Sequence, residues 1–207
     1  MLAQIRPAIV LLLLFSALTG LVYPLAITGV AQLAFAKRAN GSLVYIDGKP
    51  VGSGLIGQNF ASDRYFHSRP SATQAQDPAH PDDSSKTIDA PYNAANSTGS
   101  NLGPTSQKLI DRVKADVDAK RGAGWSAIPA DAVTTSASGL DPHISPANAL
   151  AQVAQVAKAR GMPEARVHDL VEASVENRWL GIIGEPRVNV LRLNLALDDA
   201  AVGLSQK

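Results

Sequence analysis

The chain has 207 residues, enough for one domain with a buried core and an appendage. It contains no cysteine, which excludes disulfides, thiolate catalysis and Cys-ligated metal sites. Lysine and arginine total 19 against 18 acidic residues, and this balance, without any basic run, excludes a typical nucleic-acid binder.

The N-terminal region is strongly apolar. Residues 8–36 carry no charge, and about 20 apolar residues already cross a bilayer. The pattern predicts a short tail over residues 1–7, a single transmembrane helix over 8–36 and a soluble domain over 37–207. The alternative is a cleaved signal peptide ending at Ala34-Phe35-Ala36, but the apolar part of a signal runs only about 7 to 15 residues. The length favours the anchor.

The charges that flank the span bear on its orientation. Arg6 precedes it, whereas Lys37, Arg38 and Lys49 follow it. Taken alone, the positive-inside rule favours a cytoplasmic C-terminal domain.

Small or polar residues recur every four positions along the span. They are Ser16, Gly20, Pro24, Thr28 and Gln32. We call this set the docking stripe, because a neighbouring helix can approach such a surface closely and exchange hydrogen bonds with it. The alternative is that small residues are merely tolerated in spans and that Pro24 makes a kink.

The soluble part begins with turn-forming sequence. Residues 42–56 predict two short strands about Asp47-Gly48, a dipeptide suited to a two-residue hairpin turn. Residues 58–103 are rich in Ser, Asn, Asp, Pro and Gly and show hardly any apolar period. A loop this long either binds something or is disordered.

The C-terminal half shows regular patterns. A helix is predicted from Pro104 to Gly122, a second from Ser145-Pro146 to Gly161 and a third from Pro163. Alternating residues over 184–197 predict a final strand with a bulge near 190 and 191. A hairpin, helices and a last strand make an α+β domain of mixed sheet and helix.

Common catalytic signatures are missing. The chain has no P-loop, no H-E-x-x-H and no G-x-S-x-G. Two Gly-rich strings, residues 52–60 and 96–104, are weak phosphate-binding candidates, because glycine turns can point several N–H groups one way. Ordinary turn chemistry explains the same residues.

Asp141 and His143 lie one residue apart, just before a predicted helix. A catalytic pair would need a nucleophile in reach, and the sequence names none. Asp141 before Pro142 suits a turn, and Ser145 suits a helix cap. We therefore interpret Asp141, His143 and Ser145 as structural residues or partner contacts, and we predict neither a catalytic residue nor a metal site.

Six strings carry a resemblance to a known family. They are LVYPLAITGVAQ (21–32), GSGLIGQNF (52–60), YFHSRPSA (65–72), GSNLGPTS (99–106), SGLDPHISP (138–146) and GEPRVNVLRLNL (184–195). In this order they resemble the C subunit of the Kdp-type potassium-transporting ATPase of bacteria. The resemblance covers nearly the whole chain.

The resemblance implies a non-catalytic, single-span subunit of a high-affinity potassium uptake complex in the bacterial inner membrane. The implied partners are a channel-like potassium-binding subunit, a P-type ATP-hydrolysing subunit, a small stabilising subunit and the lipid bilayer. The family places the C-terminal domain on the periplasmic side, against the charge count above, and we follow the family.

The family has also been described as a chaperone that raises the ATP affinity of the hydrolysing subunit. By resemblance, the nucleotide-binding candidates are Gln58, Ser97, Gly99, Ser100 and Asn101, with ATP shared rather than bound tightly. Thr98 departs from the family's usual glycine, which weakens this assignment. The alternative function is a membrane-anchored domain that binds or senses a small ligand through residues 58–103. An anchored hydrolase using His143 fits worst.

Overall fold

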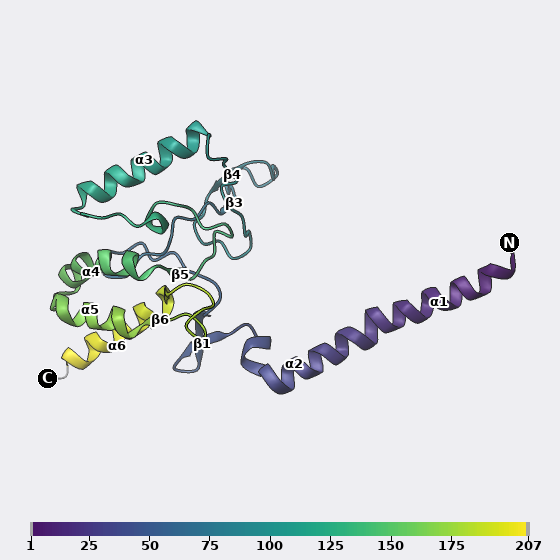
Figure 1. The fold of residues 1–207 in the computed structure, drawn as a ribbon. Helices are drawn as coiled ribbons and strands as arrows, with labels where there is room; N and C mark the ends of the chain where they lie inside the picture. Colours follow the sequence, from purple (N-terminus) through teal and green to yellow (C-terminus); the bar gives the residue numbers. More distant parts are fainter. Residues whose placement is uncertain (1, 206–207) are drawn as a thin grey trace. The chain divides into compact units, whose positions relative to one another are not determined.

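The structure of the chain, a computed structural model, describes residues 2–205. The chain divides into two compact units, with the boundary between Ser53 and Gly54. Figure 1 shows a long helix in the first unit and a mixture of helices, short strands and loops in the second. The predicted α+β class is confirmed.

The first unit begins with one continuous helical run. It comprises a 3-10 turn (Leu2–Gln4), α1 (Ile5–Ala17), a π-helical turn (Leu18–Val22) and α2 (Tyr23–Ala39). The run Ile5–Ala39 is long and apolar enough to cross a membrane, and it contains the predicted span 8–36.

The π-helical turn has a local cause in the sequence. Pro24 has no N–H to donate to the preceding turn, and a proline inside a helix displaces the carbonyls behind it. The Tyr23 N–H donates to the carbonyl of Leu18, five residues back, and the Thr19 hydroxyl donates to the Phe15 carbonyl at 2.7 Å. These bonds satisfy groups that the irregular turn would otherwise leave open.

A hairpin completes the first unit. Strand β1 (Leu43–Ile46) pairs antiparallel with β2 (Lys49–Ser53), with an irregular register between Val44 and Tyr45. Asp47 and Gly48 have φ angles of 49° and 75°, as a tight primed turn requires. The predicted hairpin is confirmed.

Over its described residues, 54–205, the second unit contains four α-helices and two small sheets. The helices are α3 (Gln107–Gly122), α4 (Pro146–Arg160), α5 (Glu164–Ala173) and α6 (Val190–Ser205). The strands β3 (Gln74–Gln76) and β4 (Thr87–Asp89) form one sheet; β5 (His143–Ile144), β7 (Arg187–Asn189) and β6 (Val175–Glu176) form the other, in that order. A short 3-10 helix spans Ala130–Ala132.

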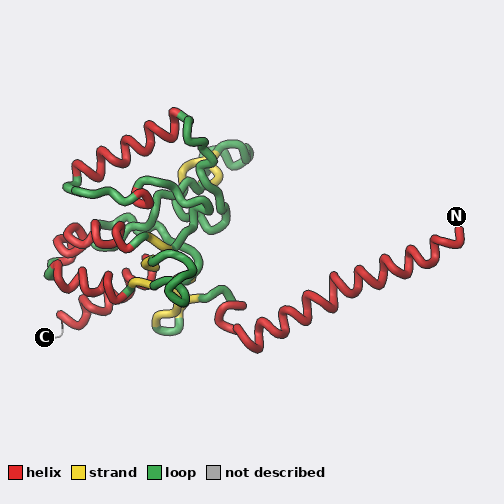
Figure 2. The backbone as a smooth tube through the Cα atoms, viewed as in Figure 1, coloured by secondary structure: helices red, strands yellow, loops and turns green. Residues whose placement is uncertain are grey.

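The apolar core lies among α4, α5, α6 and the three-stranded sheet. Helices α4 and α5 pack together, as do α5 and α6 (Figure 1). The buried side chains include Phe66, Ile144, Val156, Val167, Val171, Val188, Leu193 and Leu197. In contrast, most of the chain from Gly54 to the start of α4 is loop, as the green tube in Figure 2 shows.

Buried side-chain amides attach this loop-rich region to the core. Asn194 on α6 accepts the Phe66 N–H at 2.8 Å and donates to the Phe66 carbonyl at 3.0 Å. Gln152 on α4 likewise accepts the His67 N–H at 2.7 Å and donates to the His67 carbonyl at 3.2 Å. The amides thus replace the strand partner that this segment lacks.

One predicted element is wrong. The strand expected over 184–197 ends at Asn189, and Val190 begins α6. The alternating leucines suggested a period of two, but Val190, Leu193, Asn194 and Leu197 are all buried and fall at helical spacing. In the sequence, the polar residue Asn194 suggested an exposed position, whereas its amide is buried on the core face of a helix.

The other predicted helices are present with shifted ends. Helix α3 begins at Gln107 rather than Pro104, and none of its residues is buried. Helix α4 begins after Ser145 with Pro146 at its first position, and it ends at Gly161, as predicted. Helix α5 follows Pro163 and ends at Ala173, so Val175 belongs to β6.

Candidate functional site

The segment 136–143 forms a turn whose shape is fixed by its own polar groups. The Ser136 hydroxyl accepts the backbone N–H groups of Gly139 and Asp141, at 3.1 and 3.4 Å. Gly139 has a φ of 69°, and a Cβ at this position would lie 2.6 Å from the carbonyl oxygen of Thr98. Only glycine therefore fits this turn without strain.

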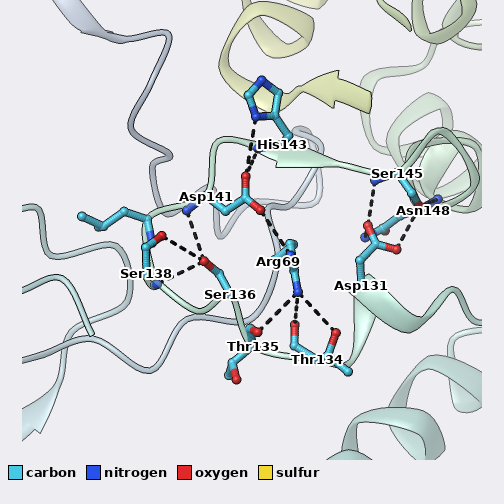
Figure 3. A network of polar contacts seen from close by, with 12 residues as sticks. Arg69, Asp131, Thr134, Thr135, Ser136, Ser138, Asp141, His143, Ser145 and Asn148 are labelled. Atoms are coloured by element: carbon cyan, nitrogen blue, oxygen red, sulfur yellow. Dashed lines mark hydrogen bonds and ion pairs between the residues drawn. The ribbon is translucent and has the colours of Figure 1, made fainter. Parts of the chain in front are cut away.

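Arg69 links this turn to the segment before it. Its NH1 donates to Oδ2 of Asp141 at 3.2 Å. Its NH2 faces the Thr134 carbonyl and hydroxyl and donates to the Thr135 carbonyl at 3.3 Å (Figure 3). One guanidinium thus joins both ends of the segment 134–141 to the chain at residue 69.

Asp141 is held on its other side by His143. Its Oδ1 accepts the backbone N–H of His143 at 3.0 Å and lies 3.6 Å from the ring nitrogen Nδ1 (Figure 3). Burial alone would raise the pKa of Asp141. The hydrogen bonds from His143 and the charge of Arg69 outweigh burial and lower that pKa below its ordinary value, so the carboxylate is ionised at neutral pH.

Tyr92, in the polar segment 58–103, contacts the residues around Arg69 and Asp141. Its hydroxyl donates toward the carbonyls of Arg69 and Asp141, at 3.0 and 3.3 Å. Burial raises the pKa of Tyr92 to about 12, so the phenol stays protonated and remains a donor. The Gly57 N–H donates to the Leu140 carbonyl at 2.8 Å, which adds a third segment to the same turn.

Ser145 has the capping role predicted for it. Its hydroxyl accepts the Asn148 N–H at 3.1 Å at the start of α4. Asp131 in turn accepts the Ser145 hydroxyl at 2.9 Å, the Ser145 N–H at 2.7 Å and the Asn148 side chain at 3.1 Å (Figure 3). The negative carboxylate at a helix N-terminus also complements the helix dipole.

This arrangement suits attachment of segments better than reaction chemistry. Each oxygen of Asp141 has a partner within the chain, the Arg69 guanidinium at Oδ2 and the His143 backbone N–H at Oδ1. The Ser136 hydroxyl contacts Ser138 and backbone N–H groups. Across residues 2–205, no group of three or more His, Cys, Asp or Glu side chains is placed to hold a metal. We call Arg69, Tyr92, Ser136, Asp141 and His143 the polar tie.

The six strings of the resemblance contain most residues of the polar tie. A model of the family described as "KdpC: K+-transporting ATPase, c chain" matches residues 5–199, nearly the whole chain. The chain belongs to the KdpC family.

Individual relatives agree with this KdpC assignment, and each is named a potassium-transporting ATPase KdpC subunit. The relative from Bradyrhizobium diazoefficiens is 62% identical over 97% of this chain and 99% of its own. One from Rhodopseudomonas palustris is 62% identical over 97% of this chain and all of its own, and one from Methylorubrum extorquens is 58% identical over 97% and 99%. The chain is thus similar to whole KdpC subunits.

Three of the nucleotide-binding candidates in this KdpC chain lie beside the segment that contains Ser136 of the polar tie. Ser97 donates to the Ser138 carbonyl at 3.0 Å, and Ser100 accepts the Thr135 hydroxyl at 3.2 Å. A Cβ at Gly99 would lie 2.6 Å from the Ala137 carbonyl. The Gln58 carbonyl accepts the Ser68 hydroxyl at 3.1 Å, and Asn101 is exposed with a φ of 49°. Three of the five candidates therefore already contact residues 135–138.

The docking stripe lies on an exposed helix. Ser16, Gly20, Pro24 and Thr28 are exposed, and a Cβ at Gly20 would meet no atom within 4 Å. The Gln32 amide, in contrast, exchanges two hydrogen bonds of 3.2 Å with the Asn40 amide of its own chain. This pair brackets Phe35, where the helix departs from helical backbone angles.

Sequence reasoning missed Arg69, Tyr92 and Asp131. Arg69 and Asp141 are 72 residues apart in the chain, so no local spacing connects them. The available signal was the motif YFHSRPSA, which carries Arg69 inside the resemblance to the KdpC family.

Proposed function

We propose that this chain is a non-catalytic accessory subunit of an ATP-driven, high-affinity potassium uptake complex and that the complex needs it for assembly and stability. The observation that carries the proposal is the KdpC family match over residues 5–199, with relatives similar over their whole length. The partners are a channel-like potassium-binding subunit, a P-type hydrolysing subunit and a small stabilising subunit.

The internal pairing within the polar tie supports the non-catalytic part of the proposal. Its ionisable groups bind one another, and it joins residues 57, 69, 92 and 134–143 into one surface. In this proposal that surface meets a partner, and the polar tie keeps it in shape.

Deletion of the chain tests the proposal directly. We expect cells that express the other subunits alone to yield little intact complex in detergent and to lose potassium-stimulated ATP hydrolysis and uptake. Normal assembly and transport without this chain would refute the proposal.

Docking of the single span is the membrane part of the proposal. Gly20→Leu fills the docking stripe with a branched side chain and should lower recovery of the complex, because close helix approach needs a small residue. Gly29→Leu is the matched control. Gly29 is equally free of neighbours in this chain, and nine residues make two and a half helical turns, which places it roughly opposite Gly20. Equal recovery of the two variants would remove the role of the docking stripe.

The role in ATP affinity is a finer part of the proposal. A nucleotide at residues 97–100 would have to share or displace the bonds that Ser97 and Ser100 make with residues 135–138. If the role holds, Ser97→Ala should raise the KM for ATP of the assembled complex without lowering its maximal rate. An unchanged KM would confine these residues to a structural role.

We also place the second unit on the periplasmic side of the bacterial inner membrane. The chain has no cysteine, so single-cysteine labelling needs no background removal. Ser84→Cys lies in an exposed loop and should react with an impermeant thiol reagent in cells with a permeabilised outer membrane, whereas Ala3→Cys, before the span, should react only after lysis. The opposite pattern would reverse the topology.

A further inference from the structure

The loop between β6 and β7 ends in an unusually apolar tip. Its sequence is Trp179-Leu180-Gly181-Ile182-Ile183, and we call these residues the apolar tip. Trp179, Leu180 and Ile182 are 67%, 72% and 76% exposed, the largest values among the large apolar side chains described in the second unit. Ile183 is 55% exposed. A cluster of this kind on an otherwise polar loop marks an interaction site.

The backbone of the apolar tip is ordered by its own hydrogen bonds. Trp179 and Ile183 exchange both bonds of a bridge, at 2.9 and 3.0 Å. The Gly181 N–H donates to the Arg178 carbonyl at 3.1 Å, and the Ile182 N–H donates to the Trp179 carbonyl at 3.2 Å. Leu180 has a φ of 52°, a left-handed conformation that leucine seldom adopts. The fold therefore presents these side chains outward at some conformational cost.

Charged side chains surround the base of the apolar tip. Arg178 pairs with Glu185 at 2.6 Å, and Glu176 pairs with Arg187 and Arg192 at 3.1 and 3.2 Å. Three guanidinium groups thus face two carboxylates, and the excess is positive. The apolar tip thus carries a tryptophan and aliphatic side chains, with three arginines at its base. At a bilayer surface tryptophan lies among the headgroups and arginine binds phosphate, so this order of side chains suits such a surface.

We infer that the apolar tip inserts into the headgroup region of the bilayer that holds the chain's own helix. The tip's bridge and turn use four of its backbone N–H groups internally, as a lipid environment requires. Four exposed side chains make a contact much smaller than the roughly 800 Å² per partner of a stable protein interface. A shallow insertion of a few side chains needs no such area when the chain is already anchored.

The anchor makes this contact accessible. Residues 40–53 link the helix to the second unit, and a fully extended segment of that length reaches about 50 Å. Because part of this segment forms the β1–β2 hairpin, its reach is shorter than that, and the link limits how far the second unit can move from the bilayer. The inference rests on the proposed single-span anchoring, so its test must separate loss of the anchor from failure of the tip.

Tryptophan fluorescence in the full-length chain provides the test. The chain has two tryptophans, so Trp125→Phe leaves Trp179 as the only one. This variant is reconstituted in bilayer nanodiscs, alone and within the assembled potassium pump, with lipids that carry a nitroxide quencher near the headgroup. We expect Trp179 emission to fall at least twofold. Adding Ile182→Ser to this variant should reduce the quenching, because Ile182 is the most exposed side chain of the tip.

The matched control is Trp179→Phe, which leaves Trp125 and should show little quenching. Trp125 packs under the Lys120 ammonium at 4.5 Å and reports on another part of the second unit. Water-like, unquenched Trp179 emission in a chain that stays with the nanodiscs would overturn the inference alone. Blue-shifted but unquenched emission, seen only in the pump, would assign the tip to a protein partner and also overturn it. A chain that fails to associate with nanodiscs would refute the anchor itself, and the inference with it.

Discussion

The two halves of the second unit are held together by different forces. Residues 146–205 form three helices whose side chains pack in an apolar core that includes Val156, Val171 and Leu193. Residues 54–145 add Phe66 and Ile144 to that core, but their one α-helix has no buried residue and their loops are joined by side-chain to backbone hydrogen bonds. We call them the apolar half and the polar half. Close packing of many weak contacts stabilises the first, and a few specific polar contacts stabilise the second.

The polar half is the part that carries the candidate site. Its loops follow the surface, yet Gly57, Arg69 and Tyr92 all contact the turn at 136–141. We therefore expect each single substitution in the polar half to act through the loss of one contact. In the apolar half, the loss in the free energy of unfolding should increase with the volume of the buried side chain that is removed.

The largest expected effect is that of Gly139→Ala. The new Cβ would meet the Thr98 carbonyl and the Thr73 side chain in a backbone region that disfavours any side chain. Left-handed strain and overpacking together should destabilise the chain by about 4 kcal/mol. Urea unfolding of the full-length chain in detergent measures the change.

Gly161→Ala is the matched control for Gly139→Ala. Gly161 has a similar φ of 66°, but a Cβ there would meet nothing within 4 Å. Its cost should be about 1 kcal/mol, from backbone strain alone. Equal losses at the two glycines would mean that the turn at 139 is not closely packed.

A cavity in the apolar half should rank next. Leu193→Ala removes a fully buried side chain from α6 and should cost about 3 kcal/mol in the free energy of unfolding. Leu195→Ala is its control on the same helix, because Leu195 is only partly buried and should lose clearly less. Equal losses at Leu193 and Leu195 would contradict the helical face assigned to α6 and favour the predicted strand, in which the alternating leucines share one face.

The amide that joins the two halves should have a smaller effect. Asn194→Ala leaves the buried N–H and carbonyl of Phe66 without partners and should cost about 2 kcal/mol. Asn96→Ala, which removes an exposed bond to the Gln74 carbonyl, should cost less than about 0.5 kcal/mol. A loss at Asn194 no greater than that at Asn96 would show that water replaces the buried amide.

The smallest effect is expected at Asp141, and it depends on pH. The lowered pKa means that the ionised carboxylate stabilises the fold above the unfolded-state pKa of about 3.9 and that this contribution is lost as pH falls through the folded-state pKa. Asp141→Asn should therefore cost about 1 kcal/mol at pH 7 and progressively less below about pH 4. A cost that is constant between pH 7 and pH 3 would exclude the charge as its cause.

Features that depend on neighbouring residues could be predicted from the sequence, and features that depend on distant residues could not. The apolar helical run, the Asp47-Gly48 hairpin and the start of α4 at Ser145 were predictable, because each depends on neighbours in the chain. Helix α6 was missed because its leucines also alternate. In addition, a polar residue such as Asn194 normally indicates an exposed position, but here it is buried and bonded to the backbone of Phe66, far away in the sequence. The spacing of apolar residues indicates which face of an element is buried, but it does not reveal hydrogen-bond partners that are distant in the sequence.

Within the polar tie, sequence reasoning found the residues on one side only. Asp141 and His143 were named because they lie one residue apart just before a helix start. Arg69 and Tyr92 contact Asp141 across 72 and 49 residues, through geometry that no spacing encodes. The polar segment 58–103 was either a ligand-binding or a disordered loop in prediction; in the structure its Tyr92, Ser97 and Ser100 bind residues 135–141.

The most direct test of the account is the turnover of the assembled pump carrying Asp141→Asn together with His143→Gln. We measure the yield of intact complex and its potassium-stimulated ATP hydrolysis per complex. We expect a lower yield and an unchanged rate for each complex that does assemble, because the proposed role of the polar tie is to attach segments and not to perform a chemical step. A normal yield with abolished hydrolysis would contradict it.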